Sequence, residues 1–311
     1  MKAFRIIDHG IQTTVQDGGR PGLMKYGIPI SGAMDQRSFT IGNLLLRNPE
    51  GAAALETALQ GLKLQALTKI TIAITGADLD PWLNNKPVPQ WTAFTVTEGD
   101  VLYFKKRKKG FRTYIAVRGG IDIPKILGSR STFARGRIGT LLREGDTLSV
   151  FPPDSKVDGH PLALPPEYWP DLDRTDPIRV IMGPQDDYFT PRGVETFLSS
   201  TYRITPHFDR QGFRTEGPAI EIAKGPGIIT DPIPPGAIQV PGDGKPIVLL
   251  RDSQVTGGYA KIATVARVEL DFLGQRMPGD TIRFKAIDRR TALEILHEEM
   301  VRLGKVRQLL Q

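Results

Sequence analysis

The chain has 311 residues, 40% of them hydrophobic, which is enough for one large domain or two of ordinary size. It contains no cysteine, and this excludes disulfide frameworks, thiol nucleophiles, iron–sulfur clusters and cysteine-based zinc sites. The net charge of +7 would suit a nucleic-acid ligand, but no aromatic residues are interleaved with the basic ones and no predicted helix carries a basic stripe.

The sequence also gives no sign of a membrane or secretory segment. No stretch approaches the roughly 18 apolar residues of a membrane span. Asp8 and His9 interrupt the N-terminal region before the apolar core of a signal peptide can form. We therefore expect a cytoplasmic protein that binds neither nucleic acid nor membranes.

Short runs of apolar or alternating residues, bounded by Gly, Pro or Asp, predict a chain rich in β-strands. In chain order, such runs are residues 4–7, 70–74, 101–104, 113–117, 178–181 and 247–250. The five basic residues 105–109 lie between two of these runs. Because like charges stay hydrated and keep strand edges from pairing, we predict that they form the solvated tip of a hairpin.

Helical patterns are few. Asp35 is placed to cap a helix that extends to about Arg47. Thr190 followed by Pro191 has the N-cap and first-turn chemistry of a second helix, which extends to about Leu198.

A third helix is predicted near the C-terminus. Asp288 is placed to cap it, and Gly304 is predicted to end it. The apolar residues that recur at steps of three and four within it are Leu293, Leu296, Met300 and Leu303.

A Gly-Asp turn that leads into a strand occurs three times, at Gly99-Asp100, Gly145-Asp146 and Gly279-Asp280. The second and third copies each close a β-rich stretch, and a segment rich in Pro and Asp follows the second. We predict an N-terminal domain over residues 1–175, including a proline-rich linker at 151–175, and a C-terminal domain over 176–311 with the terminal helix. The many short strands suggest a barrel or sandwich in each half.

Several catalytic signatures are absent. Gly242-Asp243-Gly244-Lys245 is followed by Pro246, which breaks the P-loop pattern and the helix that would hold a phosphate. No dinucleotide-binding glycine fingerprint and no nucleophile elbow occur. The four histidines lie far apart without metal-ligand spacing, and we interpret them as ordinary structural or surface residues: His9, His160, His207 and His297.

Polar and glycine residues are concentrated in four segments, residues 13–35, 128–132, 209–218 and 236–264. Clustered glycines let backbone N–H groups approach a ligand, and Arg and Lys supply charge for a carboxylate or phosphate. A purely structural role is the alternative, since Asp243-Gly244 suits a tight hairpin turn and Gly257-Gly258 suits a bulge. The four polar residues that directly follow the run 247–250 favour a site, because core packing would not place them there.

In these segments the sequence resembles the family of the 5-oxoprolinase C subunit, also called the KipA or allophanate hydrolase subunit 2 family, which is related to the carboxyltransferase domain of urea carboxylase. The shared motifs are T-T-V-Q-D-G-G-R at 13–20, G-x-P-x-S-G-A-M-D at 27–35, G-S-R-S-T at 128–132, G-A-I-Q-V-P-G-D-G-x-P-I at 236–247 and T-G-G-Y-x-K-I-A-T-V at 256–265. The resemblance implies a mainly β fold of two cyclophilin-like β-barrel domains with a few short helices and a C-terminal helix. It also implies a site that needs no metal.

The chain departs from the family pattern in two places. The usual D-R-Q-T-T-G-G-Y-P-K is D-S-Q-V-T-G-G-Y-A-K at 252–261, and the usual G-R-x-L is G-T-L-L at 139–142. These changes do not alter the expected fold, and they leave the exact substrate open.

The resemblance implies an ATP-hydrolysing lactam hydrolase that opens 5-oxo-L-proline to L-glutamate. ATP would be a co-substrate, and no metal or covalent biotin would be held by this chain. Its partners would be a B-like (KipI-like) protein and the A-type component of the full complex. Phosphorylation of an amide oxygen breaks the amide resonance, so the site must neutralise a phosphate and a carboxylate and stabilise an oxyanion.

We assign candidate roles on that basis. The candidate catalytic residues are Asp17, Asp252 and Lys261. The candidate substrate-binding residues are Gln16, Arg20, Arg130, Gly242, Asp243, Gln254, Thr256, Gly257, Gly258 and Tyr259. If Asp252 and Lys261 line a surface cleft, their substitution should reduce activity with little change in melting temperature.

Two other functions stay open at this point. A KipA-like regulator would antagonise a partner that inhibits a kinase, and it would need a binding surface in place of a polar cleft. A biotin-dependent carboxyltransferase component, as in urea carboxylase, would need a biotinyl domain and an ATP-grasp carboxylase, which this chain does not contain.

Overall fold

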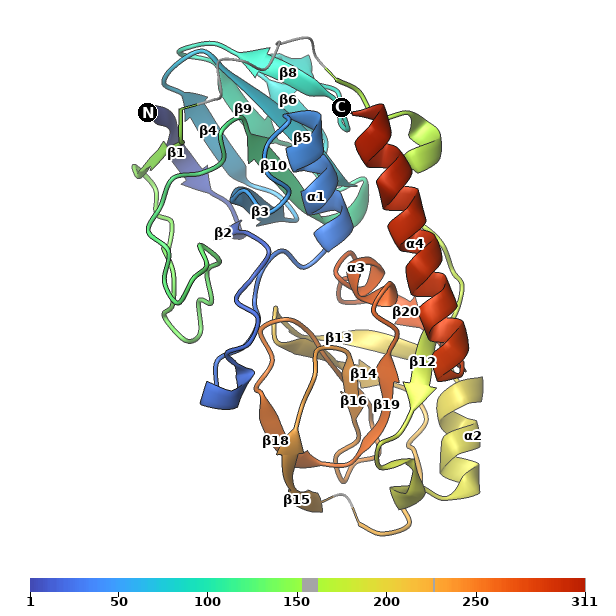
Figure 1. The fold of residues 1–311 in the computed structure, drawn as a ribbon. Coiled ribbons are helices and arrows are strands. Elements are labelled where there is room, and N and C mark those ends of the chain that lie inside the picture. Colours follow the sequence, from blue (N-terminus) through green and yellow to red (C-terminus); the bar gives the residue numbers. More distant parts are fainter. Residues whose placement is uncertain (153–161, 226, 311) are drawn as a thin grey trace. The chain divides into compact units, whose positions relative to one another are not determined.

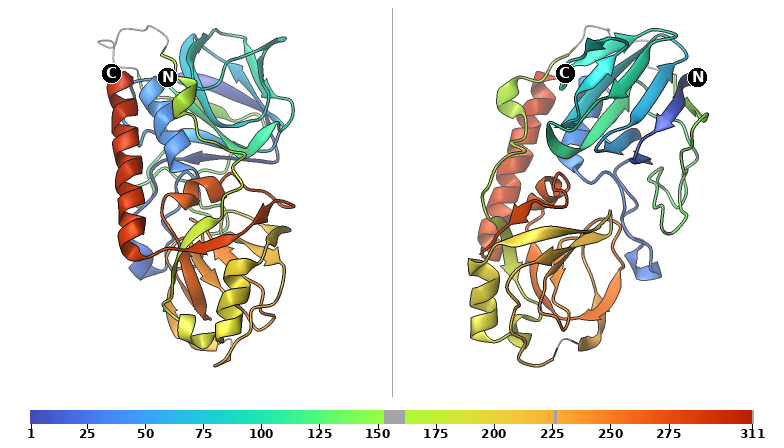
Figure 2. Two further views of the ribbon diagram at one scale, coloured as in Figure 1. Left: turned by 90° about the vertical axis from the view of Figure 1, so that its right-hand side faces the viewer. Right: turned by 180° about the vertical axis from the view of Figure 1, so that it is seen from behind.

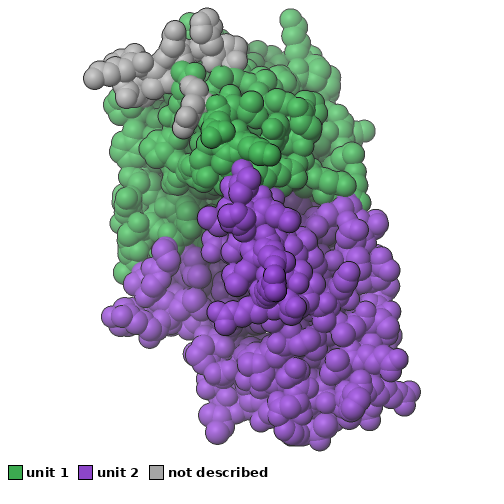
Figure 3. All heavy atoms as spheres, turned by 45° about the vertical axis from the view of Figure 1, so that its right-hand side comes forward, with its two compact units in different colours: residues 1–20, 31–173, 302–311 green, residues 21–30, 174–301 purple. Residues whose placement is uncertain are grey.

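The computed structural model describes residues 1–152, 162–225 and 227–310, and it is mainly β with few helices, as predicted (Figures 1 and 2). The chain divides into two compact units, coloured in Figure 3. Unit 1 consists of Met1–Arg20, Ser31–Asp173 and Arg302–Gln311, and unit 2 consists of Pro21–Ile30 and Arg174–Val301. The sequence-based domain ranges 1–175 and 176–311 are continuous. In the structure, Pro21–Ile30 belongs to unit 2 and Arg302–Gln311 belongs to unit 1.

Unit 1 contains two antiparallel sheets. The six-stranded sheet has the order β11 (Thr147–Ser149), β1 (Lys2–His9), β4 (Leu62–Ala66), β9 (Val101–Phe104), β6 (Pro81–Leu83) and β7 (Lys86–Pro87). The five-stranded sheet has the order β2 (Gln12–Gln16), β3 (Ala54–Ala58), β10 (Lys109–Val117), β5 (Ile70–Asp78) and β8 (Ala93–Val96).

The apolar run at the start of β5 is buried on both faces. Ile72 and Ile74 join the core cluster that contains Phe4 and Leu64 of the six-stranded sheet. Ala73 points to the opposite face and packs with helix α1 (Gln36–Leu45) and the end of α4 (Arg289–Leu309). Residues 72–74 form the short continuous apolar run that a strand buried on both faces requires.

Unit 2 contains an eight-stranded sheet that nearly closes into a barrel. Its order is β20 (Thr281–Ile282), β13 (Tyr202–Phe208), β14 (Gly212–Glu216), β17 (Ile247–Leu249), β16 (Ala237–Gln239), β19 (Lys261–Val265), β12 (Ile178–Met182) and β21 (Phe284–Ala286). The two edge strands are separated in sequence by Arg283 alone, so one bent segment brings the edges of the sheet together. Unit 2 also contains β15 (Gly227–Pro232) paired with β18 (Thr256–Tyr259), and helices α2 (Pro191–Ser199) and α3 (Glu269–Leu273).

The predicted helix caps are confirmed. The Asp35 carboxylate accepts a hydrogen bond from Ser38 N at 2.9 Å at the start of α1, and Thr190 Oγ1 accepts from Gly193 N at 3.0 Å at the start of α2. Asp288 accepts from a backbone N–H of the first turn of α4 at 2.7 Å. These side chains satisfy N–H groups that have no partner within the helix.

The predicted end of the third helix is wrong. Helix α4 continues through Gly304 to Leu309, because Val306 beyond that glycine is buried in the core of unit 1. Leu293 and Met300, two of the apolar residues that recur along this helix, are 56% and 62% exposed.

The three Gly-Asp turns share one set of hydrogen bonds. In each, the Asp carboxylate accepts from the backbone N–H three residues before it, and the Asp N–H donates to the carbonyl of that same residue. The glycines have φ between +87° and +96°, a conformation that favours glycine. Each turn is followed by a short strand, β9, β11 or β20.

The hairpin predicted around residues 105–109 is wrong, although all five basic residues are exposed as expected. Strand β9 before them pairs with β4 and β6, while β10 pairs with β3 and β5 in the other sheet. The basic segment therefore connects two sheets. Lys108 Nζ lies 2.6 Å from the Asp80 carboxylate, and the pKa of that carboxyl is lowered by this bond.

Part of the predicted linker, residues 153–161, lies outside the described residues. After it, the short helix η2 (Pro166–Tyr168) precedes β12. Across residues 1–152, 162–225 and 227–310, no helix is both long and apolar enough to cross a bilayer.

Candidate functional site

In unit 1 the Asp17 carboxylate joins the first two polar segments. It follows β2 and is 8% exposed. Oδ1 accepts from Gly19 N at 2.8 Å, Ser129 Oγ at 2.6 Å and Ser131 Oγ at 2.5 Å, while Oδ2 accepts from Arg130 N at 2.7 Å. Four donors fill most of the capacity of one carboxylate, so this side chain anchors the loop at 128–132 to the end of β2.

The two arginines predicted for unit 1 lie beside this anchor. The Arg20 guanidinium is buried and donates to the Ser131 carbonyl. Arg130 is half-buried, donates through Nε to the Ile123 carbonyl at 2.8 Å and lies 4.8 Å from the centre of the Phe151 ring. Of the two, Arg130 is the one with exposed surface for an anionic ligand.

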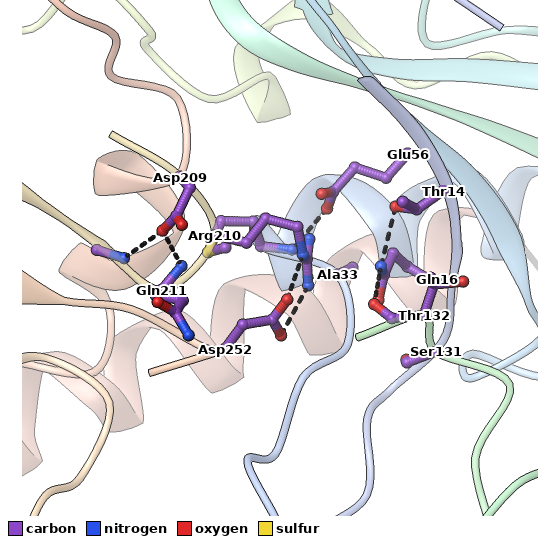
Figure 4. Close-up of polar contacts among 12 residues, drawn as sticks. Thr14, Gln16, Ala33, Glu56, Ser131, Thr132, Asp209, Arg210, Gln211 and Asp252 are labelled. Carbon is purple, nitrogen blue, oxygen red and sulfur yellow. Dashed lines mark hydrogen bonds and ion pairs between the residues drawn. The ribbon is translucent and has the colours of Figure 1, made fainter. Parts of the chain in front are cut away.

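Gln16 is fully buried, and only one end of its amide is satisfied. Nε2 donates to Thr14 Oγ1 at 2.9 Å and to the Thr132 carbonyl at 3.0 Å (Figure 4). Oε1 has no hydrogen-bond partner among the residues that the structure describes. A buried acceptor without a donor is costly in a protein interior, so this oxygen is a position for the N–H or O–H of a ligand or a water.

A buried network under residues 33–35 was not predicted from the sequence. Glu56 Oε2 accepts from Met34 N and from Tyr114 Oη, both at 2.8 Å, and Tyr114 Oη in turn accepts from Asp35 N at 2.8 Å. Burial raises the pKa of the Tyr114 hydroxyl well above its ordinary value, and the Glu56 carboxylate raises it further. The sequence did carry one signal of this network, because Glu56 is a charged residue at the centre of the buried strand β3.

In unit 2, Asp252 is 3% exposed and forms an ion pair with Arg210. Arg210 Nε lies 2.8 Å from Asp252 Oδ2, Nη2 lies 3.4 Å from Oδ1, and Asp252 N donates to the Arg210 carbonyl at 3.0 Å (Figure 4). The structure thus brings together the third and fourth polar segments. Because Asp252 is buried in a two-point ion pair, the expected placement on a surface cleft is not what the structure shows.

Lys261 is also buried, and its partners were not predicted. Lys261 Nζ lies 2.6 Å from Asp231 Oδ2, and Gln185 Nε2 donates to the same oxygen at 3.2 Å. Gln185 also bonds to the Lys261 backbone in both directions, at 3.1 and 3.2 Å. The two side-chain hydrogen bonds hold the pKa of the Asp231 carboxyl below its ordinary value, Lys261 contributing more than Gln185.

The remaining candidates lie on two turns and a strand of unit 2. Asp243 is exposed and accepts from Lys245 N at 3.1 Å in the connection between β16 and β17, next to exposed Gly242. Gln254, Thr256 and Tyr259 are exposed on β18 or just before it, where Gly257 and Gly258 are half-buried. The tight hairpin turn predicted at Asp243-Gly244 is wrong: residues 240–246 connect β16 and β17, and the turn spans 241–244, where Gly244 N donates to the Pro241 carbonyl at 2.9 Å.

The candidates therefore form separate groups. Unit 1 brings Gln16, Asp17, Arg20 and Arg130 together, while in unit 2 Asp252 and Lys261 have different partners. No group of three His, Asp or Glu side chains in the described parts of the chain could hold a metal ion. His9, His207 and His297 are exposed, and His160 lies outside the described residues.

Comparison with known proteins assigns the family. The family model described as "Carboxyltransferase domain, subdomain A and B" matches residues 26–286. The chain belongs to this family. The 5-oxoprolinase C subunit of Haemophilus influenzae is 32% identical over 308 residues, covering 98% of this chain and 97% of that protein. The 5-oxoprolinase C subunit of Escherichia coli K12 is 34% identical over 302 residues, covering 95% of each.

A solved structure agrees. The crystal structure of the K. lactis urea amidolyase matches 99% of this chain with a TM-score of 0.92 at 32% identity, and this chain covers 20% of that larger chain. The mainly β fold expected from the family resemblance is thus confirmed.

Proposed function

We propose that this chain is the C subunit of a multi-subunit, ATP-dependent 5-oxoprolinase, which opens 5-oxo-L-proline to L-glutamate in the cytoplasm. The observation that carries the proposal is the length of the match. The chain covers 97% and 95% of two relatives that are named as C subunits of 5-oxoprolinase, so the similarity extends over nearly the whole of both proteins.

The chemistry sets what the assembled enzyme must supply. Transfer of the γ-phosphoryl group of ATP to the lactam oxygen releases ADP and makes the carbon open to attack by water. After water adds, the C–N bond breaks to give an amine and an acyl phosphate, and a second water releases inorganic phosphate and leaves the carboxylate. Positive groups must offset the charge that develops on oxygen. For that role we propose Lys261 in unit 2 and, in unit 1, the half-buried Arg130 and the buried Arg20.

The proposed roles of the polar residues follow from their hydrogen bonds. Gln16 Oε1 is an open acceptor for a substrate N–H. Asp17 and Asp252 are proposed for proton transfer or for binding the substrate N–H, and each would have to exchange an existing hydrogen bond for one to the ligand. The exposed or half-buried residues of β18, of the residues just before it and of the turn after β16 are proposed to orient the substrate: Gly242, Asp243, Gln254, Thr256, Gly257, Gly258 and Tyr259.

Partner proteins complete the proposal. We expect a stable complex with a B-like (KipI-like) protein, joined by the A-type component in the full enzyme, with ATP as co-substrate. We expect no 5-oxoproline-dependent ATP hydrolysis by this chain alone, since it lacks a recognised nucleotide motif.

A carboxyltransferase component is the second candidate, favoured by the near-complete structural match to the K. lactis urea amidolyase. In that case the reaction would also require a biotinyl domain and a carboxylase, which these 311 residues do not include.

The deciding experiment is co-expression with the genes for the A-type and B-like components of the same genome, followed by assay of 5-oxoproline-dependent ATP hydrolysis. We expect turnover by the assembly only, reduced at least about 10²-fold by Lys261→Met. Lys224→Met is the matched control, because Lys224 pairs with Asp187 on the surface and should leave turnover unchanged. An assembly that carboxylates urea in the presence of a biotinylated partner, and leaves 5-oxoproline intact, would favour the second candidate.

A further inference from the structure

Lys261, Asp231 and Gln185 form a closed ring of hydrogen bonds in unit 2. Asp231 Oδ2 receives Lys261 Nζ at 2.6 Å and Gln185 Nε2 at 3.2 Å, and Gln185 is bonded to the Lys261 backbone by its own N–H and by Oε1. One residue, Gln185, therefore fixes both members of the ion pair.

Of the two charged side chains in this ring, only Lys261 is buried. The Lys261 side chain is 2% exposed, whereas that of Asp231 is 39% exposed. Among the described residues, Asp231 is the only ion-pair partner of Lys261, and Oδ1 of Asp231 makes no hydrogen bond. Burying an ammonium is costly unless it is paired with a counter-charge, and here one carboxylate supplies it.

The carboxylate comes from a strand outside the eight-stranded sheet. Asp231 is on β15, which pairs with β18, and the two strands lie side by side in Figure 1. Asp231 stands opposite Gly257, next to the exposed Thr256. The pairing of β15 with β18 thus places Asp231 beside Gly257, one of the glycines proposed to contact the substrate.

We propose that Asp231 and Gln185 are positioning residues, which keep the Lys261 ammonium charged and directed toward the ligand in the proposed reaction. The inference rests on the proposed function for the role of Lys261. The ion pair between Lys261 and Asp231 is present in the structure whatever the reaction is. Asp231 acts through its charge, and Gln185 acts by holding Asp231 Oδ2 and the Lys261 backbone in register.

The first test measures Lys261 in the isolated full-length chain, where no substrate or partner is needed. Trace labelling with isotopic acetic anhydride at about pH 8, followed by peptide mass spectrometry, reports the neutral amine. We expect Asp231→Asn to raise labelling of Lys261 about tenfold or more, because loss of the counter-charge favours the neutral form of a buried amine. Gln185→Leu should raise it less, because the Asp231 charge stays and only the hydrogen bonds that hold the pair in register are lost. Asp231→Glu keeps the charge and should stay close to wild type.

The matched control is Asp187→Asn. Asp187 pairs with Lys224 at side-chain exposures of 60% and 54%, so its removal should leave Lys261 labelling unchanged and alter Lys224 only slightly. Unchanged Lys261 labelling in folded Asp231→Asn and Gln185→Leu would overturn the proposal.

The second test measures turnover in the assembled complex. We expect Asp231→Asn to lower kcat about 10²-fold and to change KM less, with rescue by Asp231→Glu. Raised labelling with unchanged kcat would overturn the positioning role in the reaction. A wild-type complex without 5-oxoproline turnover would instead contradict the proposed function, and the labelling result would still decide whether Asp231 and Gln185 control the amine.

Discussion

The ion pair between Asp252 and Arg210 makes a quantitative prediction about stability. Both side chains are at most 6% exposed, and removing one partner of a buried pair typically costs about 3–5 kcal/mol. Asp252→Asn keeps the shape and one acceptor oxygen, so we expect a loss near the lower end, about 3 kcal/mol. At roughly 2–4 °C per kcal/mol for a domain of 150–250 residues, the melting temperature should fall by about 6–12 °C.

The assay is thermal unfolding of the isolated chain, with a double-substitution cycle. Arg210→Met should also destabilise, whereas Asp252→Leu combined with Arg210→Met should recover most of the loss, because an apolar pair of similar volume replaces two buried charges. Asp243→Asn is the control, since that exposed turn residue should change stability by less than about 0.5 kcal/mol.

The outcomes separate a structural role of Asp252 from a role in the reaction. A melting temperature of Asp252→Asn within about 1 °C of wild type would refute the prediction and mean that the buried pair does not form in solution. If the double variant regains stability but the assembled complex stays inactive, Asp252 has a role in the reaction beyond its structural one. If activity returns with stability, the carboxylate is structural.

Three further predictions concern single residues. Gly32→Ala should destabilise by at least about 1–2 kcal/mol in urea unfolding, because its φ is +85° and a Cβ would lie 2.8 Å from a backbone nitrogen. Tyr114→Phe should cost about 1–3 kcal/mol in the same assay, since Glu56 loses a buried donor. The pKa of the Asp100 carboxyl is lowered, chiefly by the hydrogen bond from the backbone N–H of Thr97. The ionised carboxylate therefore stabilises the folded chain at pH values above the unfolded pKa of about 3.9. This contribution is lost as the pH falls through the lower pKa of the folded state. Asp100→Asn should therefore be less stable than wild type at neutral pH. In unfolding curves the difference should disappear as the pH falls below the pKa that Asp100 has in the folded chain.

The features that sequence predicted well are local. Asp35 and Thr190 cap their helices because a side-chain oxygen three residues before a backbone N–H needs no tertiary partner. The Gly-Asp turns are equally local, since each set of bonds closes within four residues.

The features that sequence missed depend on distant residues. Strand alternation marks residues 101–104 and 113–117 as strands, but it does not say which strands they pair with, and they join different sheets. Gly304 lies where a helix end is plausible, but burial of Val306 extends α4 past it. Local pattern cannot weigh these contacts, which form only when the chain is folded.

The same limit applies to the candidate site. Asp231 is followed by prolines in a segment without any motif, and it is 30 residues from the lysine that it neutralises. Gln185 is further still from Lys261 in the sequence, at 76 residues. Motif reading found Lys261 but had no means of finding its counter-charge.

Hydrogen-bonding capacity separates anchor residues from residues that are open to a ligand. Asp17 belongs to a dense glycine-rich segment, and its carboxylate already accepts four hydrogen bonds from the described residues. Gln16 beside it has a buried oxygen with no partner among those residues, whereas the Asp231 side chain is 39% exposed and its outer oxygen is accessible to solvent. Glycines permit both close backbone packing and close approach of a ligand. The number of glycines in a segment therefore does not tell a structural role from a binding role. A buried acceptor without a donor favours ligand or water binding, because an unpaired acceptor in the interior is costly for folding. On this argument we propose Gln16 as the ligand contact of this segment, while Asp17 anchors the loop at 128–132.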